Sequence, residues 1–225
     1  MPRALFLCSG TGSVGEPFRE AGWEVVDVDW DGRYGAEVQE DIMTWDYKAF
    51  APGTFQLVWA SPDCAQYSIA RKRAATPRDF PTADALVQKC LEIIEYLDPP
   101  MWFLENPDTG YLKTREFMQG IPFVRVDECM YGTSHRKRTR LWCNSEACST
   151  WTPNMCDKSH CIAIHRPRCT VYRHETSAQR GYPSARIRED RAAGITGQSR
   201  HYSRDALHRL PRALCDEIFA QACLV

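Results

Sequence analysis

The sequence has 225 residues, 44% of them hydrophobic, and a net charge of −1. That is enough chain for one α/β domain with its own core and a small accessory region. No apolar stretch approaches the roughly 20 residues of a membrane helix, and Met1-Pro2-Arg3 leads into an apolar run without a signal-peptide pattern. We therefore expect a cytoplasmic protein without membrane contacts. Its eleven cysteines are expected to be free, catalytic or metal-bound rather than disulfide-linked.

Short apolar runs alternate with helical patterns over the first 145 residues. Strands are predicted at residues 4–8, 23–28, 55–60, 101–104 and 140–143, and helices at about 14–21 and 83–97. This alternation predicts a mostly parallel α/β sheet with helices on both faces. Residues 146–204 keep no hydrophobic period and predict a small irregular region, whereas 207–224 regains helical spacing. We therefore expect a domain of residues 1–145 and 205–225, interrupted by the region 146–204.

Charge is distributed unevenly along the chain. Residues 133–212 hold 16 of the 28 Lys and Arg but only 6 of the 29 Asp and Glu. Clustered arginine is typical of nucleic-acid binding, although a solvated basic surface would give the same composition. The second part of the chain is thus a candidate for binding a polyanion.

A glycine-rich turn, residues 8–15, lies between the first predicted strand and helix. Glycines allow a ligand to approach the backbone closely, and a helix N-terminus offers free N–H groups. The next strand ends in Asp29, 19 positions after Gly10, where Rossmann-type sites place a carboxylate on ribose hydroxyls. Trp30 is suited to stack on an adenine and Asp41-Ile42 to read its edge. The glycine spacing alone also fits a nicotinamide dinucleotide.

Cys64 follows the predicted strand that ends near Ala60, so it lies where open α/β sheets collect ligands and chemistry. Glu105-Asn106 follows the next strand. A buried structural thiol and a carboxylate that braces a loop are the alternative interpretations of Cys64 and Glu105. The order of these features is what favours a cysteine nucleophile with a carboxylate partner.

In this order the motifs resemble those of the cytosine-C5 DNA methyltransferase family, especially its compact phage-type members. The matching segments are Leu7 to Gly12, Asp29, Ser61-Pro62-Asp63-Cys64, Glu105-Asn106, and Tyr131-Gly132 followed by His135 to Trp142. The resemblance covers residues 4–145 and the returning helix. It implies a Rossmann-like class I methyltransferase fold and an S-adenosylmethionine cofactor, held by Cys8, Ser9, Gly10, Thr11, Gly12, Asp29, Trp30, Asp41, Ile42 and Ser61.

The resemblance also implies DNA (cytosine-5-)-methyltransferase activity on double-stranded DNA. Cys64 would add to carbon 6 of a flipped cytosine and Glu105 would share a proton with its nitrogen 3. Asn106 would fix the loop, and Arg138 or Arg140 would contact the base. Either arginine could instead bind phosphate, because most protein–DNA hydrogen bonds go to the backbone.

Four positions depart from the family pattern: Phe6, Asp63, Pro107 and His135. Asp63 replaces a proline and places a negative charge beside Cys64, which raises the pKa of a thiol unless a cation compensates. The run 136–140 does not align uniquely with the family's arginine motif, so the sequence does not decide between Arg138 and Arg140.

The region 146–204 matches the place of the family's target-recognition region. Its cysteines and histidines predict a zinc site, with free thiols as the alternative. The expected ligands are Cys148, Cys156, Cys161 and His174, with Cys169 as the alternative to His174. Gln179 and Arg180 are candidate base readers, and Arg71, Lys72 and Arg73 are candidate phosphate contacts. So small a region predicts a short target such as GpC or CpG.

Two other functions remain in view: RNA cytosine-C5 methylation, and DNA binding by an inactive regulator of the same fold. We expect a monomer in the cytoplasm, or in the nucleus if the host is eukaryotic, and a role such as restriction-modification stays open.

Overall fold

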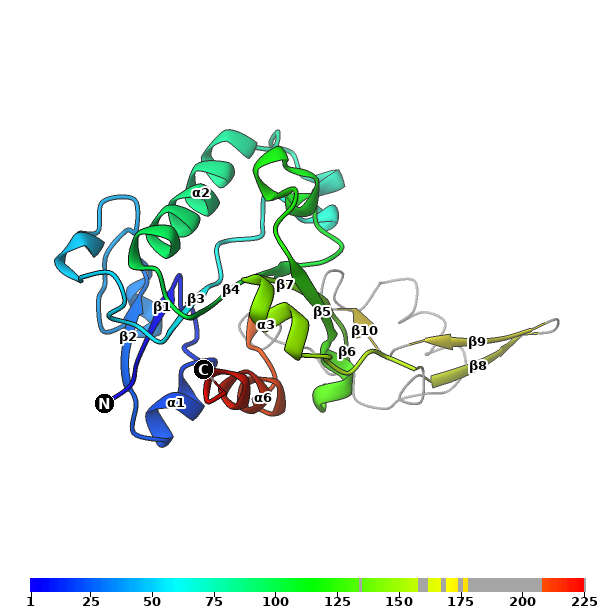
Figure 1. Ribbon diagram of the computed structural model, residues 1–225. Helices are drawn as coiled ribbons and strands as arrows, with labels where there is room; N and C mark the ends of the chain where they lie inside the picture. Colours follow the sequence, from blue (N-terminus) through cyan, green and yellow to red (C-terminus); the bar gives the residue numbers. More distant parts are fainter. Residues whose placement is uncertain (134, 158–161, 167–168, 174–175, 178–207, 225) are drawn as a thin grey trace.

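A computed structural model describes residues 1–133, 135–157, 162–166, 169–173, 176–177 and 208–224. A six-stranded sheet lies at its centre, in the order β2-β1-β3-β4-β7-β5 (Figure 1). Its strands are β1 (Arg3–Leu7), β2 (Glu24–Val28), β3 (Leu57–Ala60), β4 (Met101–Pro107), β5 (Phe123–Asp127) and β7 (Arg138–Cys143). The first four in spatial order are parallel, and β7 runs antiparallel to both of its neighbours.

Helices cover both faces of this sheet, which confirms the predicted α/β architecture (Figure 1). The long helix α2 (Phe80–Leu97) packs on one face, while α1 (Glu16–Glu20) and α6 (Arg212–Ala222) lie on the other. Each face has its own buried cluster: Phe6, Trp59 and Phe103 lie on the α1/α6 side, and Val58 and Trp142 lie on the α2 side. Buried strands between two helical layers explain the nearly unbroken apolar runs in the sequence.

Local signals set the ends of α2. Asp79 caps its N-terminus by accepting a hydrogen bond from the Thr82 N–H, and Asp98 ends it in a left-handed conformation with φ of 45°. The helix begins at Phe80, three residues before the predicted start. Short connections in the described part of the chain add α3 (Ser145–Thr150) and the 3-10 helices η1 (Gly32–Tyr34), η2 (Tyr47–Ala49), η3 (Ile69–Arg73), η4 (Leu112–Thr114), η5 (Glu116–Met118) and η6 (Glu128–Tyr131).

The region 146–204 contains regular structure that the sequence did not predict. β8 (Ile162–Arg166) and β9 (Cys169–Arg173) pair antiparallel, and β10 (Thr176–Ser177) pairs in parallel with β6 (His135–Arg136). These strands form two small sheets outside the central one. The pairing of β10 with β6 connects residues 176–177 to the short strand that precedes β7 in the chain.

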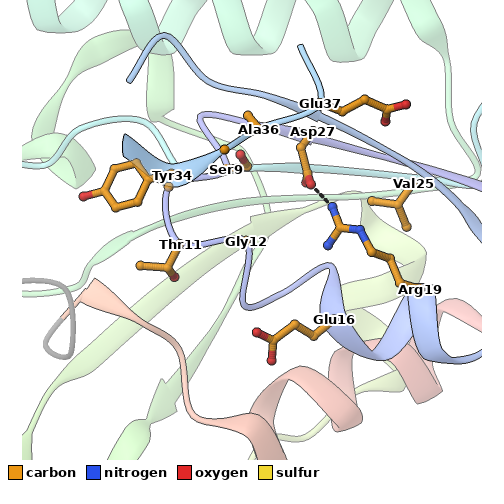
Figure 2. Close-up of a pocket in the computed structure, with 12 residues that line it drawn as sticks. Ser9, Thr11, Gly12, Glu16, Arg19, Val25, Asp27, Tyr34, Ala36 and Glu37 are labelled. Carbon is orange, nitrogen blue, oxygen red and sulfur yellow. Dashed lines mark ion pairs between the residues drawn. The ribbon is translucent and has the colours of Figure 1, made fainter. Parts of the chain in front are cut away.

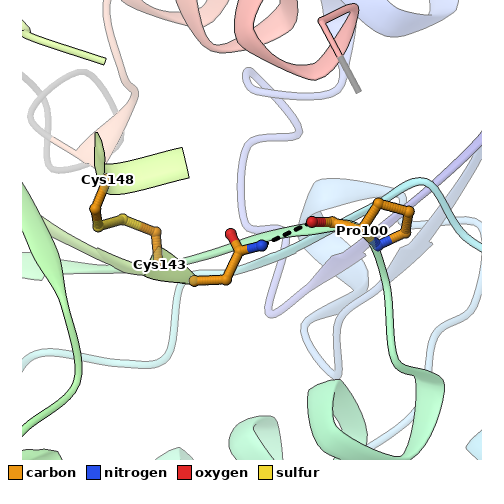
Figure 3. The surroundings of a disulfide bond; sticks show 4 residues. Pro100, Cys143 and Cys148 are labelled. Carbon is orange, nitrogen blue, oxygen red and sulfur yellow. Dashed lines mark hydrogen bonds between the residues drawn. A yellow bond between two sulfur atoms is a disulfide. The ribbon is translucent and has the colours of Figure 1, made fainter. Parts of the chain in front are cut away.

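The prediction that Cys148 binds zinc is wrong, and so is the expectation that the cysteines form no disulfides. Cys148 is bonded to Cys143 (Figure 3), because α3 begins just after β7 and its first turn returns Cys148 to the strand's last residue. A sulfur in a disulfide is not a thiolate ligand. Cys161 and His174 lie outside the described residues, and within those that are described no three His, Cys, Asp or Glu side chains are grouped to hold a metal ion.

None of the described helices is both long enough and apolar enough to span a bilayer.

Phe18 tests the packing of α1 and α6 on the sheet. Its ring is fully buried and makes edge contacts with Phe6, Trp23 and Phe219. We expect Phe18→Ala to lower the free energy of unfolding by about 3–5 kcal/mol, because it leaves a cavity among these rings. Urea denaturation measures this, with Leu224→Ala as control, since that side chain is 75% exposed; equal losses in both variants would contradict the packing role.

Candidate active site at the strand ends

The turn after β1 leaves space for a ligand. Gly10 and Gly12 have φ of 51° and 68°, a conformation that favours glycine. A Cβ on either residue would meet nothing within 4 Å, so the backbone of the turn is open to an approaching group. The turn is held from the next strand, because the Gly10 N–H donates to Asp29 Oδ2 at 2.8 Å.

Asp29 lies at the end of β2 with 6% of its surface exposed. Its second oxygen, Oδ1, accepts a hydrogen bond from the Asp31 N–H at 2.8 Å. Both carboxylate oxygens of Asp29 therefore accept hydrogen bonds from backbone N–H groups, and through Gly10 this residue positions the turn. Each oxygen keeps a further lone pair that a hydroxyl could use.

The predicted adenine contacts have different environments. Trp30, next to Asp29 in the chain, is 73% exposed. Ile42 is buried in the α2-side core, and the exposed Asp41 uses Oδ1 to accept from the Met43 N–H. None of these three residues lines the cavities described next.

One cavity of about 130 Å³ brings the cofactor turn and the proposed chemistry together. The predicted site residues that line it are Cys8, Ser9, Gly10, Thr11, Ser61, Cys64 and Glu105. Lys137 also lines it, as do His208 and Leu210 from the segment before α6. The ends of β1, β3 and β4 supply most of this wall, because parallel strands open their carboxyl ends at one edge of a sheet.

A second cavity, of about 540 Å³, also borders the turn (Figure 2). Gly12 lines it together with Tyr34 and the ion pair between Arg19 of α1 and Asp27 of β2. Ser9, Gly10 and Thr11 border both cavities. The turn thus contributes to the lining of both the larger cavity and the cavity that contains Cys64.

A hydrogen bond from the side chain of Asn106 fixes the loop that carries Cys64. The fully buried Asn106 donates from Nδ2 to the Pro62 carbonyl at 3.0 Å. After Cys64 the chain turns at once, since the N–H groups of Tyr67 and Ser68 both donate to the Cys64 carbonyl. Asp63 is drawn into the same turn by accepting from the Ala65 N–H.

Burial and two carboxylates make Cys64 a weak acid. Burial first, then Glu105 and Asp63, raise the pKa of the Cys64 thiol to about 12, while Lys137 lowers it. The thiol is therefore the main form at neutral pH. The sequence anticipated the effect of Asp63 but not the larger effects of burial and Glu105.

Glu105 is held close to neutrality. Burial raises its pKa to about 7, the positive charge of Lys137 lowers it, and Glu128 raises it. Its Oε1 is buried and accepts no hydrogen bond from the described residues. A carboxyl that is partly protonated at pH 7, with an oxygen free to pair, can exchange a proton with a bound base.

Lys137 is the residue of this site that the sequence did not single out. Its Nζ pairs with Glu128 Oε1 at 2.9 Å. Burial disfavours its charged form, but Glu128 and Glu105 more than offset this and raise the pKa of Lys137 above its ordinary value. It therefore remains an ammonium beside Cys64.

The structure does not bring the two predicted arginines to the cavity. Arg138 forms a two-pronged pair with Asp127 on β5, and Arg140 pairs with Asp108 and lies over the Phe123 ring at 3.8 Å. Side chains alternate across a strand, so on β7 these arginines share one face and Thr139 and Leu141 the other. Glu105 lies directly opposite Leu141 in the β4–β7 register.

Predicted DNA contacts lie partly outside the described residues. Arg71, Lys72 and Arg73 belong to η3, shortly after Cys64. Arg71 donates to Thr76 Oγ1 at 2.6 Å, and Lys72 is exposed. Gln179 and Arg180 are not among the described residues.

The sheet order, the single antiparallel strand β7 and the ligand-sized openings around the first turn define a Rossmann-like class I methyltransferase fold. No protein-family model matches the chain. A protein of Frog virus 3 (isolate Goorha) named "Probable DNA (cytosine-5)-methyltransferase" is 35% identical over an alignment of 195 residues that covers 80% of this chain and 87% of the viral protein. The chain belongs to the DNA (cytosine-5)-methyltransferase family.

Among solved structures, the proposed DNA modification methyltransferase of an E. coli prophage has a TM-score of 0.49 and 17% identity, over 70% of this chain and 52% of the other. A Spodoptera frugiperda DNMT2 mutant has a TM-score of 0.41 and 15% identity, over 70% of this chain and 54% of the other. The chain spans about half the length of these solved structures.

Glu105 predicts a pH dependence of stability. Its pKa is about 7 in the folded protein and 4.5 ordinarily, so its contribution is complete below pH 4.5 and is lost as the pH rises through 7. We expect the wild type to lose about 1–3 kcal/mol over this window and Glu105→Gln to lose less. Denaturant unfolding at several pH values measures this. Glu116→Gln, at an exposed position, is the control and should keep the wild-type decline; the same decline in Glu105→Gln would refute the assignment.

Proposed function

We propose that this protein is a DNA cytosine-C5 methyltransferase that uses S-adenosylmethionine and forms a covalent bond between Cys64 and its target base. The observation that carries the proposal is the cavity shared by the cofactor turn, Cys64 and Glu105. Membership of the family supports the reaction class, and the relative from Frog virus 3 carries the name of the same activity.

The residues around the first turn fit the cofactor. Gly10 and Gly12 expose backbone beside open space, Asp29 has lone pairs available, and Trp30 is exposed. We assign these residues, with Cys8, Ser9, Thr11 and Ser61, to holding S-adenosylmethionine. When bound, this molecule supplies an electrophilic methyl group.

Cys64 and Glu105 supply the activation of the base. The Cys64 thiol gives its proton to solvent and its sulfur bonds to carbon 6 of cytosine, while the Glu105 carboxyl gives a proton to nitrogen 3. The electron pair of the 5,6 double bond then makes carbon 5 nucleophilic. After carbon 5 is methylated, its proton passes to solvent, the 5,6 double bond forms again as the bond from carbon 6 to the Cys64 sulfur breaks, and nitrogen 3 returns its proton to Glu105. A carboxyl with a pKa of about 7 can give and regain its proton near neutral pH.

The substrate base must leave the helix to reach Cys64, because carbon 6 is stacked in a duplex. The basic 3-10 helix η3 follows Cys64 closely along the chain. We assign Arg71, Lys72 and Arg73 to the DNA backbone around the flipped nucleotide.

Covalent trapping tests the role of Cys64. DNA containing 5-fluorocytosine should form a stable adduct, because fluorine at carbon 5 cannot be lost as a proton is. We expect the wild-type protein with S-adenosylmethionine to give a shifted band on denaturing gels and Cys64→Ser to give none. The variant Cys223→Ser, at an exposed cysteine on the far end of α6, is the control and should trap normally. Tight DNA binding by the wild type without an adduct would favour an inactive DNA-binding regulator.

Substrate class and target length are tested by methyl incorporation. We expect duplex plasmid DNA to be labelled and tRNA not, and base-resolution mapping to find methylation in a dinucleotide context such as GpC or CpG, because the recognition region is short. Preferential labelling of tRNA would replace the proposal by RNA methylation. A long, strict consensus would refute the short target.

A further inference from the structure

Cys64 faces an unusual excess of negative charge for a nucleophilic thiol. Asp63 precedes it in the loop and Glu105 lines the same cavity, and both disfavour the thiolate. A nucleophile in such surroundings needs a nearby cation, because the thiolate is the reactive form. The described residues contain one group that meets this need.

Lys137 directly precedes β7, and by its position in the chain it falls on the same face of the sheet as Leu141 and Glu105. It precedes Leu141 by four residues, and Leu141 lies opposite Glu105. Residues an even number apart along an extended chain share a face, which is why Lys137 reaches the cavity of Cys64 and Glu105 while Arg138 and Arg140 do not. The arginines are also engaged by Asp127 and Asp108.

Glu128 holds Lys137 in this place. It is fully buried on η6, accepts the Lys137 ammonium at 2.9 Å and accepts the Thr139 hydroxyl at 2.9 Å. The same two residues are also linked through their backbones, because the Glu128 N–H donates to the Lys137 carbonyl at 3.0 Å. With only 10% of its side chain exposed, Lys137 has little freedom to turn to solvent.

We propose that Lys137, positioned by Glu128, is the counter-ion of the Cys64 thiolate in this site. The ammonium offsets Asp63 and Glu105 when the sulfur becomes negative, and Glu128 keeps it from leaving. The other titratable side chains that line the cavity, among the described residues, are Cys8, Tyr34 and His208, the last on the segment before α6. The inference rests on the proposed function for the reaction that the thiolate serves, but the effect on the thiol can be measured without that reaction.

The experiment measures the rate at which iodoacetamide alkylates Cys64 in the intact protein, read by peptide mass mapping between about pH 6 and pH 9. Loss of a neighbouring charge shifts a pKa by about 1–3 units. Each unit lowers the thiolate fraction about tenfold, and the higher nucleophilicity of a more basic thiolate recovers about a factor of three. We therefore expect Lys137→Gln to react about 3- to 30-fold more slowly at every pH.

Two variants separate charge from structure. Lys137→Arg keeps the charge and should react within about threefold of the wild type. The double variant Lys137→Gln/Glu128→Gln removes the buried pair together, so no unpaired carboxylate is left to destabilise the fold, and it should be as slow as Lys137→Gln. Lys89→Gln is the matched control, because Lys89 also pairs with a glutamate at 2.9 Å but lies on α2 away from the cavity; it should react at the wild-type rate.

Wild-type alkylation rates in folded Lys137→Gln or in the double variant would overturn the inference. Methyl transfer and 5-fluorocytosine trapping are measured on the same preparations. If the wild type gives neither, the proposed function fails while the alkylation rates still decide the role of Lys137. If the wild type methylates DNA and Lys137→Gln matches it in both assays, the inference alone fails.

Discussion

The antiparallel pairing of β7 with β4 determines what surrounds Cys64. In that register Glu105 lies opposite Leu141, so the face of β7 that contains Thr139 and Leu141 looks toward the chemistry, and the arginines on the other face look toward Asp108 and Asp127. A shift of one residue would exchange the two sets, because side chains alternate from one face to the other. The charge at the centre of the site is therefore set by strand register rather than by the number of basic residues nearby.

Burial then strengthens the electrostatic interactions among the charged groups of the site. Cys64, Glu105 and Lys137 line one small cavity, where few water molecules can screen their interactions. Burial favours a neutral thiol and a neutral carboxyl and opposes a charged lysine, while Glu128 first and then Glu105 raise the pKa of Lys137 and keep it charged. Burial thus favours the protonated forms of both Cys64 and Glu105, and the proposed reaction requires each of these groups to give up its proton.

Much of the frame could be predicted from local pattern. The apolar runs predicted β1 to β4 and the helical spacing predicted α2 and α6, because burial between two helical layers leaves a strong mark on each segment. The short edge strand β5 has the sequence Phe-Val-Arg-Val-Asp, a mixed apolar and polar pattern over five residues, and it was missed. The strands β8, β9 and β10 were also missed, because residues 146–204 carry no hydrophobic period in the sequence. The Cys143–Cys148 bond could not be read from eleven cysteines without knowing that α3 turns back on β7.

The sequence by itself determined the fold class, the order of the motifs and the presence of Cys64, Glu105 and the glycine turn, because each depends on residues that are near one another in the chain. Tertiary structure alone decided which cation reaches Cys64, that Asp29 holds the turn through Gly10, and that Cys148 is not available to a metal. These outcomes depend on strand register and on contacts between distant segments. The run 136–140 offers four positive charges, and only the pairing of β7 with its neighbours distinguishes Lys137 from the arginines around it.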